Sequence, residues 1–331
     1  MPLPPLPPPP GSCRLPSVNI YPHHKTGTEM VWFGGDLATA ALHARGCIGR
    51  GFWADWFNLP MRMAPTREQA GDCFVHEERN PIEMVVSAYR YHLLDGTPEP
   101  WRYMTFDKCD EPNFGGWDWA FGGPQNCTGL SHDERNLGSH APIRWLQPCA
   151  SWWNNYGGAV CSLRGYAKQG RIPMMSGTEN FREYLARIDV EDGLVVQMLW
   201  LEVVWHSMER LHELAANSTD NCSMNICYDT FVAKCANTWR EIVKKMFGLE
   251  EGPLLDAAVS AAELECPGNL VGGIAAEAHS GDATAPPLKD ISDWTKGEMM
   301  QMARKLDTEG NSGRVQKLEA KIGCGISPDY E

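Results

Sequence analysis

The alternation of hydrophobic and polar residues predicts a strand, a turn and a helix near the start of the chain. Residues 17–21 (Ser-Val-Asn-Ile-Tyr) form a short apolar run that is typical of a buried strand. Residues 22–28 (Pro-His-His-Lys-Thr-Gly-Thr) are polar and contain a glycine, so they predict a turn. From 29 to 45 apolar residues recur at helical spacing, and Gly46 is a suitable end for such a helix.

A second unit with the same pattern follows. Residues 73–76 predict a strand, residues 77–80 a turn, and Pro81 suits the first position of a helix that runs to about Leu94. Two strand–loop–helix units in succession indicate an α/β fold, with a central parallel sheet flanked by helices.

The remaining chain divides into segments of different character. Residues 1–16 are rich in proline and predict a disordered leader, which leaves 17–331 as a single domain. Residues 95–175 are rich in Trp, Gly, Asn, Pro and Cys, with little periodicity, and indicate an elaborated binding region inserted into the domain. Further helices are expected at 179–188, 191–216, 229–247 and 290–306, a strand at 224–227, and a loop or flap at 267–287.

Composition narrows the classes of function. Of the 331 residues 43% are hydrophobic, which is enough to bury a core. Acidic residues outnumber basic ones by 42 to 29, and the net charge of −13 argues against a broad nucleic-acid-binding surface. A small polyanion in a local pocket remains compatible with that charge. No apolar stretch approaches the 18 to 20 residues of a membrane-spanning helix, so no membrane span is expected.

The cysteines predict neither a metal site nor a particular compartment. The chain has 12, and the closest group, Cys222, Cys227 and Cys235, lacks a Cys-x-x-Cys pair and nearby histidines. The proline-rich leader lacks the basic and apolar regions of a signal peptide. We therefore expect a cytoplasmic location, with a disulfide-bonded form in the Golgi lumen as the alternative if the sequence belongs to a longer chain.

The first loop has the properties of an anion-binding site. The amide groups at a helix N-terminus point outward and the helix dipole favours negative charge there. Gly27 allows a ligand to approach the backbone, Thr26 and Thr28 offer hydroxyl donors, and Lys25 adds a positive charge. The lysine precedes the glycine, so this is not a nucleoside-triphosphate Walker loop, and an ordinary turn with a capping threonine is the alternative.

The second loop adds an arginine and a serine. Arg79 follows a predicted strand and Ser87 lies eight residues later, inside the predicted helix. Arginine pairs with phosphate through two parallel hydrogen bonds, and a serine can donate to the same group. The alternative is a surface ion pair and a solvent-facing serine.

Together the two loops resemble the nucleotide motifs of sulfotransferases that use 3′-phosphoadenosine 5′-phosphosulfate (PAPS). Lys25-Thr26-Gly27-Thr28 is similar to the family's 5′-phosphosulfate loop, and it departs from that pattern by having His24 directly before the lysine. Arg79-Asn80-Pro81 with Ser87 is similar to the segment that holds the 3′-phosphate. The resemblance implies a P-loop-like sulfotransferase fold with PAPS as sulfuryl donor, 3′-phosphoadenosine 5′-phosphate (PAP) as product and no metal.

Two weaker similarities extend the implied nucleotide site. Tyr228 precedes a predicted helix and is similar to the family tyrosine that lies near the adenine. Ser280 and Gly281 lie where the family has its C-terminal loop over the cofactor, although the usual Arg-Lys-Gly is missing here. The resemblance covers about residues 17–94 and 222–306 at the level of motifs.

The implied reaction needs a residue that stabilises the leaving phosphate and a base. Lys25 is expected at the phosphate and His24 as the general base, with His23 as an alternative that could equally brace the loop. The insertion 95–175 is then expected to bind the acceptor, and the expected substrate-binding residues are Trp53, His92, His140 and Glu179.

The sequence leaves the acceptor and some competing functions open. We expect the hydroxyl or amine of a small molecule as acceptor, and a carbohydrate is the alternative. A non-catalytic nucleotide-binding module and a P-loop kinase are the competing functions, although the kinase would need magnesium and an earlier glycine.

Overall fold

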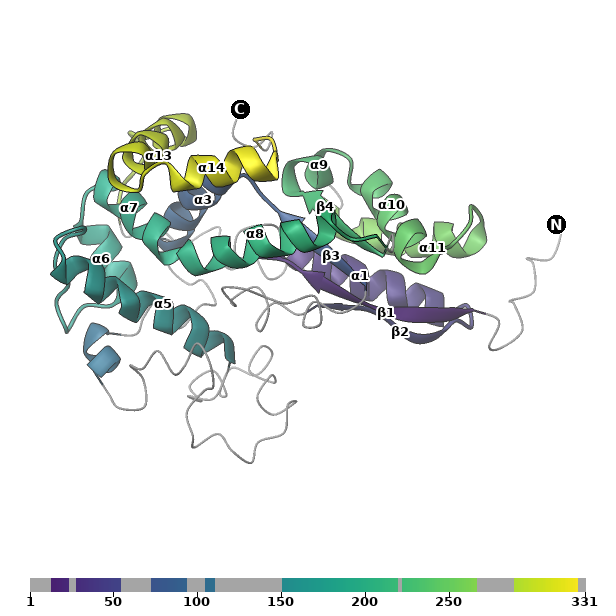
Figure 1. Ribbon diagram of the computed structural model, residues 1–331. Helices are drawn as coiled ribbons and strands as arrows, with labels where there is room; N and C mark the ends of the chain where they lie inside the picture. Colours follow the sequence, from purple (N-terminus) through teal and green to yellow (C-terminus); the bar gives the residue numbers. More distant parts are fainter. Residues whose placement is uncertain are drawn as a thin grey trace.

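A four-stranded parallel sheet forms the centre of the protein, for which the computed structural model describes residues 13–23, 28–54, 73–93, 105–110, 151–219, 222–266 and 289–326. The strands are β1 (Arg14–Tyr21), β2 (Ile48–Ala54), β3 (Phe74–Glu78) and β4 (Ser223–Cys227), and their order in the sheet is β2-β1-β3-β4 (Figure 1). All neighbours pair in parallel, so the expected α/β architecture is confirmed at this level.

One face of the sheet is covered by α1 (Thr28–His43), α10 (Cys235–Phe247) and α11 (Pro253–Ala262). Val18, Ile20 and Val75 project from this face into a hydrophobic cluster that includes Trp239 of α10. Gly34 of α1 faces the Trp239 ring so closely that an added Cβ atom would lie 2.4 Å from it. The glycine therefore permits the close contact between the two helices.

The opposite face is covered by α8 (Glu202–Ala216), which crosses the sheet in Figure 1. Tyr21 and Phe74 project from this face and pack against Leu211 and Ala215 of the helix. Because successive strand residues point to opposite faces, His76 and Glu78 of β3 share this face with Phe74.

A second hydrophobic cluster is built from helices beside the sheet. It joins α3 (Pro81–Leu93), α5 (Ser151–Lys168), α6 (Phe181–Arg187), α7 (Val190–Trp200), α13 (Lys296–Gly310) and α14 (Arg314–Ile322). Short helices Tyr228–Ala233 (α9), Phe106–Asp110 and Glu263–Glu265 complete the described elements. The side chains of α3 and α7 are almost all buried in this cluster, so α3 links the sheet to the helical part.

Several boundaries differ from the sequence-based expectations. Strand β1 begins at Arg14, so residues 14–16, which were expected in the leader, belong to the strand; Arg14 and Leu15 pair with the start of β2. The expected helix 191–216 is two helices, α7 and α8, which meet at Leu201. Helix α5 begins at Ser151, so part of the expected insertion 95–175 belongs to the core instead.

Disulfides connect the elements. In the described chain every cysteine is paired, as Cys13–Cys47, Cys73–Cys222, Cys109–Cys161, Cys227–Cys324 and Cys235–Cys266. Disulfides form and persist mainly in oxidising compartments, so the pairing weighs against the expected cytoplasmic location. Among the described residues, no helix has the length and apolar character needed to cross a membrane.

Candidate functional site

The two strands that precede the sequence motifs, β1 and β3, are neighbours in the sheet. From β1 the chain continues to β2 on one side, whereas β3 lies on the other side of β1, so the strand order reverses between β1 and β3. In open parallel sheets ligands bind outside the carboxyl ends of the strands at such a reversal. Strands β1 and β3 end at Tyr21 and Glu78, on the two sides of this reversal.

Part of the expected site lies outside the described residues. These residues are His24, Lys25, Thr26, Gly27, His140, Ser280 and Gly281. Thr28 is the first residue of α1, which confirms that the first motif directly precedes a helix. The description of the site therefore starts from the second motif.

Arg79 and Tyr228 are brought together at the ends of β3 and β4. Glu78 and Cys227 pair in register, so the residues that follow them are neighbours. The Arg79 guanidinium lies 4.3 Å from the centre of the Tyr228 ring, a cation–π contact. This places two of the expected nucleotide-binding residues beside each other.

Glu83 also belongs to this arrangement, and the sequence interpretation missed it. Its carboxylate accepts a hydrogen bond of 2.8 Å from the Arg79 guanidinium, and the side chain is fully buried. The spacing of four residues between Arg79, just before α3, and Glu83, in its first turn, was the signal that could have indicated the pair. A phosphate that binds Arg79 would share the guanidinium with this carboxylate, because the guanidinium offers five N–H donors.

Asn80 explains how the second motif positions Arg79. Its Oδ1 accepts hydrogen bonds from the backbone N–H groups of Ile82 and Glu83, at 3.0 and 3.2 Å. Asparagine is a strong N-cap residue and proline suits the next position, so Asn-Pro sets the start of α3. Its Nδ2 donates to Glu319 at 2.8 Å, which fastens the start of α3 to α14. Ser87 lies about two turns further along α3 and is partly exposed.

The expected acceptor-binding residues do not gather at one place. Trp53 lies at the carboxyl end of β2, is 45% exposed, and has the Arg50 guanidinium 4.2 Å above its ring. His92 is buried in the helical cluster, where its Nδ1 lies 3.0 Å from Gln197 Oε1, so in the described structure it lies in the core. Glu179 pairs with Arg187 at 2.9 and 3.0 Å in a turn before α6.

A group of polar side chains, three of them buried and one partly exposed, lies directly beside the second motif. It consists of His23, His76, Glu78 and His212, and we call it the histidine–glutamate cluster. The Nε2 atoms of His23 and His76 are 2.7 Å apart. His76 Nδ1 lies 3.1 Å from Glu78 Oε1, and His212 Nδ1 on α8 lies 2.7 Å from the same oxygen. No pattern in the sequence indicated this cluster, because its members come from three separate elements.

The electrostatics of the cluster favour an ionised carboxylate. Burial by itself raises the pKa of Glu78, but the hydrogen bonds and charge of His212 and His76 outweigh it, so the pKa lies below its ordinary value. The hydrogen bond to Glu78 in turn raises the pKa of His212. Glu78 thus carries a negative charge between two histidines at the edge of the candidate site.

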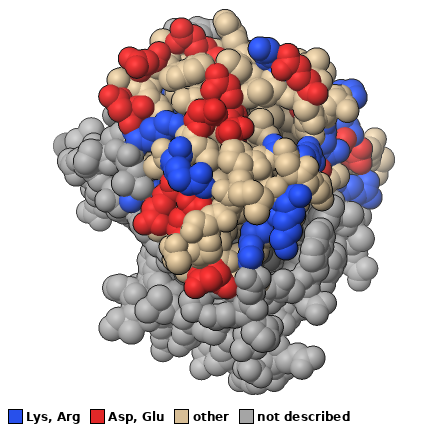
Figure 2. Space-filling view, turned by 90° about the vertical axis from the view of Figure 1, so that its left-hand side faces the viewer, with Lys and Arg blue, Asp and Glu red and all other residues tan. Residues whose placement is uncertain are grey.

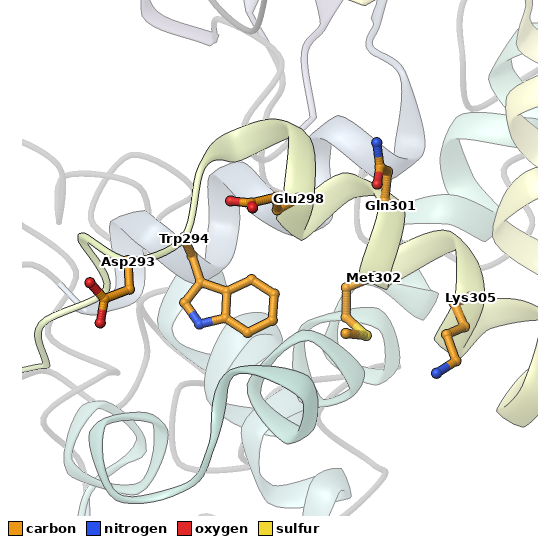
Figure 3. Close-up of a pocket in the computed structure, with 6 residues that line it drawn as sticks. All are labelled: Asp293, Trp294, Glu298, Gln301, Met302 and Lys305. Carbon is orange, nitrogen blue, oxygen red and sulfur yellow. The ribbon is translucent and has the colours of Figure 1, made fainter.

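Two other features of the described residues lie outside the arrangement around Arg79 and Tyr228. The carboxylate of Glu78 and the sulfur atoms of Cys227 and Cys324 lie close enough for one metal ion. Those two cysteines form a disulfide, however, and their sulfur atoms are therefore not thiolate ligands. A surface hollow of about 430 Å³ lies along α13, away from the strand ends, and is lined by Asp293, Trp294, Glu298, Gln301, Met302 and Lys305 (Figure 3).

The surface charge gives no continuous basic field on the face shown in Figure 2. Over the described residues of that face, Lys and Arg side chains are interspersed with Asp and Glu. Figure 2 therefore shows no extended surface of one sign for a long polyanion among those residues.

Comparison with known proteins does not assign the chain to a family. No family model matches the chain, and neither the curated proteins nor the solved structures gave a match.

Proposed function

We propose that the protein is a PAPS-dependent sulfotransferase. The observation that carries the proposal is the position of Arg79, stacked on Tyr228 at the carboxyl ends of β3 and β4, next to the strand-order reversal. A cation and an aromatic ring side by side suit a nucleotide that carries a phosphate near its base. The Lys25 loop and the Arg79 loop also follow each other along the chain in the order of the two sulfotransferase motifs that they resemble.

In this proposal each loop contacts one end of the nucleotide. Arg79 and Ser87 bind the 3′-phosphate, and Tyr228 lies near the adenine. Lys25, Thr26, Gly27 and Thr28 bind the 5′-phosphosulfate, with Lys25 stabilising the leaving phosphate. Ser280 and Gly281 are proposed to cover the nucleotide.

The acceptor in this proposal is the hydroxyl or amine of a small molecule. On the face shown in Figure 2 the charges of the described residues are interspersed, so that face offers no extended basic surface of the kind a long sulfated polymer would need. Trp53 is the remaining acceptor-binding candidate among the described residues, because its exposed ring lies at the same end of the sheet. The disulfides support an oxidising compartment such as the Golgi lumen as the place where the protein acts.

Calorimetric titration with PAP tests the nucleotide assignment, with ATP and magnesium as the matched control. We expect PAP to bind more tightly than ATP with magnesium. Preference for ATP with magnesium would favour the P-loop kinase instead, and binding of neither nucleotide would contradict the proposal. A titration with 5′-AMP, which lacks the 3′-phosphate, measures how much this phosphate contributes to the binding affinity. We expect 5′-AMP to bind more weakly than PAP.

A further inference from the structure

The histidine–glutamate cluster lies beside the second motif of the candidate site. His23 is the last described residue before the first loop, and Glu78 directly precedes Arg79. His76 and Glu78 are fully buried, His23 is almost so, and the side chain of His212 is 19% exposed. A buried line of titratable groups therefore runs from the β1–α1 connection to the surface of α8.

The hydrogen-bond network assigns which nitrogen of each ring carries a proton. Asn225 Nδ2 donates to the backbone oxygen of His212 at 3.2 Å, and this fixes the orientation of the amide. The Oδ1 atom of Asn225 therefore faces His76 Nδ1, 3.0 Å away, and the ionised Glu78 lies 3.1 Å from the same nitrogen. Both neighbours are acceptors, so Nδ1 of His76 carries the proton.

This assignment extends to His23. In neutral His76 the other nitrogen, Nε2, has a lone pair, so the 2.7 Å contact is a hydrogen bond donated by Nε2–H of His23. His23 then has its basic lone pair on Nδ1. A catalytic histidine is generally oriented by a side chain that hydrogen-bonds to its other ring nitrogen, and His76 occupies this position relative to His23.

We propose that His23 is the general base of the transfer, and that His76 and Glu78 are positioning residues that receive and stabilise the positive charge. This proposal rests on the proposed sulfotransferase function. It assigns the base to the described histidine His23, in place of the His24 expected from the sequence.

The step balances in protons and electrons. The acceptor O–H bond breaks and its proton goes to Nδ1 of His23, while the acceptor oxygen forms a bond to sulfur. The bond from sulfur to the bridging oxygen breaks, and its electron pair stays on the leaving phosphate. The Nε2 proton of His23 moves to Nε2 of His76, so the positive charge rests on His76 beside the Glu78 carboxylate. The proton passes to water after the products leave.

The charged groups around the cluster support proton transfer from His23 toward His76. The Glu78 carboxylate lies 3.1 Å from His76, and its second hydrogen bond comes from His212. On the side of α8 and α14, Glu213 raises and Lys321 lowers the pKa of His212. The Cys324 sulfur lies 4.0 Å from the other Glu78 oxygen and carries no charge, because it is disulfide-bonded.

The kinetic test compares His23→Asn and Glu78→Gln with the control His206→Gln. His206 lies on α8 and contacts Arg314, outside the cluster. We expect His23→Asn to lower kcat by about 10²- to 10⁴-fold. Glu78→Gln should lower kcat and move the ascending limb of the kcat–pH profile to lower pH by about one unit, because the base loses its anion. PAP affinity should stay within about twofold of wild type, a readout that a general loss of structure would change. Unchanged kcat and pH profiles in both variants would overturn the proposal.

A second measurement is independent of turnover. Long-range ¹H–¹⁵N spectra of the histidine side chains in the wild-type protein report the tautomers directly. The proposal requires His76 protonated on Nδ1 and His23 on Nε2 in the neutral state. His76 protonated on Nε2 alone would overturn the relay, even if Glu78→Gln failed to fold. Absence of PAP binding together with the predicted tautomers would instead locate the error in the proposed function.

Discussion

Replacing Arg79 by alanine should lower the stability of the protein as well as its affinity for PAP. Glu83 is fully buried and receives its hydrogen bond from Arg79 at 2.8 Å. Removal of one partner of a buried ion pair leaves an uncompensated charge, which costs about 3–5 kcal/mol. We expect the free energy of unfolding of Arg79→Ala to fall by about this amount, measured by urea denaturation at neutral pH.

A second substitution separates this loss from the loss of binding. Glu83→Gln removes the buried charge, so the double variant Arg79→Ala/Glu83→Gln should regain most of the lost stability. Its affinity for PAP should not recover. A desolvated, charge-assisted contact to phosphate contributes about 2–4 kcal/mol. PAP should therefore bind to the double variant about 30- to 900-fold more weakly than to the single variant Glu83→Gln.

The assay is calorimetric titration of PAP at one salt concentration with the wild type, both single variants and the double variant. Comparison of the double variant with Glu83→Gln measures only what Arg79 contributes to the bound phosphate. Equal PAP affinity in these two proteins would refute the assignment of Arg79 to the 3′-phosphate. Equal stability of Arg79→Ala and the double variant would refute the assignment of the stability loss to Glu83.

Three further predictions address the loop, the cluster and the C-terminal segment. Lys25→Ala should abolish sulfuryl transfer without changing the far-ultraviolet circular dichroism, and residual transfer above one-tenth of wild type would contradict its role. The Glu78–His212 pair should stabilise the fold most between about pH 4.5, where Glu78 with its lowered pKa is already ionised, and about pH 6.5, where His212 with its raised pKa is still charged. The difference in Tm between wild type and His212→Asn should therefore shrink as pH rises through the raised pKa of His212, and a difference independent of pH would contradict this. Replacing Cys227 and Cys324 by serine opens a connection between residues 97 apart and should cost about 2–4 kcal/mol of unfolding free energy in urea, whereas no loss would show that the disulfide is dispensable for stability.

The sequence predicted the elements with strong local patterns. Strands β1 and β3 and helices α1 and α3 follow from apolar runs, turn residues and the Asn-Pro start of α3. Strand β2 was missed because its Ile-Gly-Arg-Gly start has the composition of a turn. The structure gives Gly49 and Gly51 positive φ angles of 124° and 72°, and a Cβ atom on Gly49 would lie 2.2 Å from the Leu15 carbonyl oxygen.

The candidate site was predictable only in part, because several of its contacts join residues that are far apart in the sequence. Arg79 and Tyr228 could be named from their motifs, since each follows a predicted strand. The hydrogen bond between His23 and His76 joins residues 53 apart, and the one between His212 and Glu78 joins residues 134 apart. Such contacts depend on the strand order and on α8 covering one face, and no local pattern encodes either.

The measurement that tests the central claim most directly is transfer itself. Purified protein would be incubated with PAPS and a set of small-molecule alcohols and amines, and PAP and sulfated product would be quantified together. The account predicts that one PAP forms for each sulfated acceptor, and that Lys25→Ala forms neither. A wild-type protein that binds PAP but forms no sulfated product with any acceptor, carbohydrates included, would contradict the enzyme and leave a nucleotide-binding module in its place.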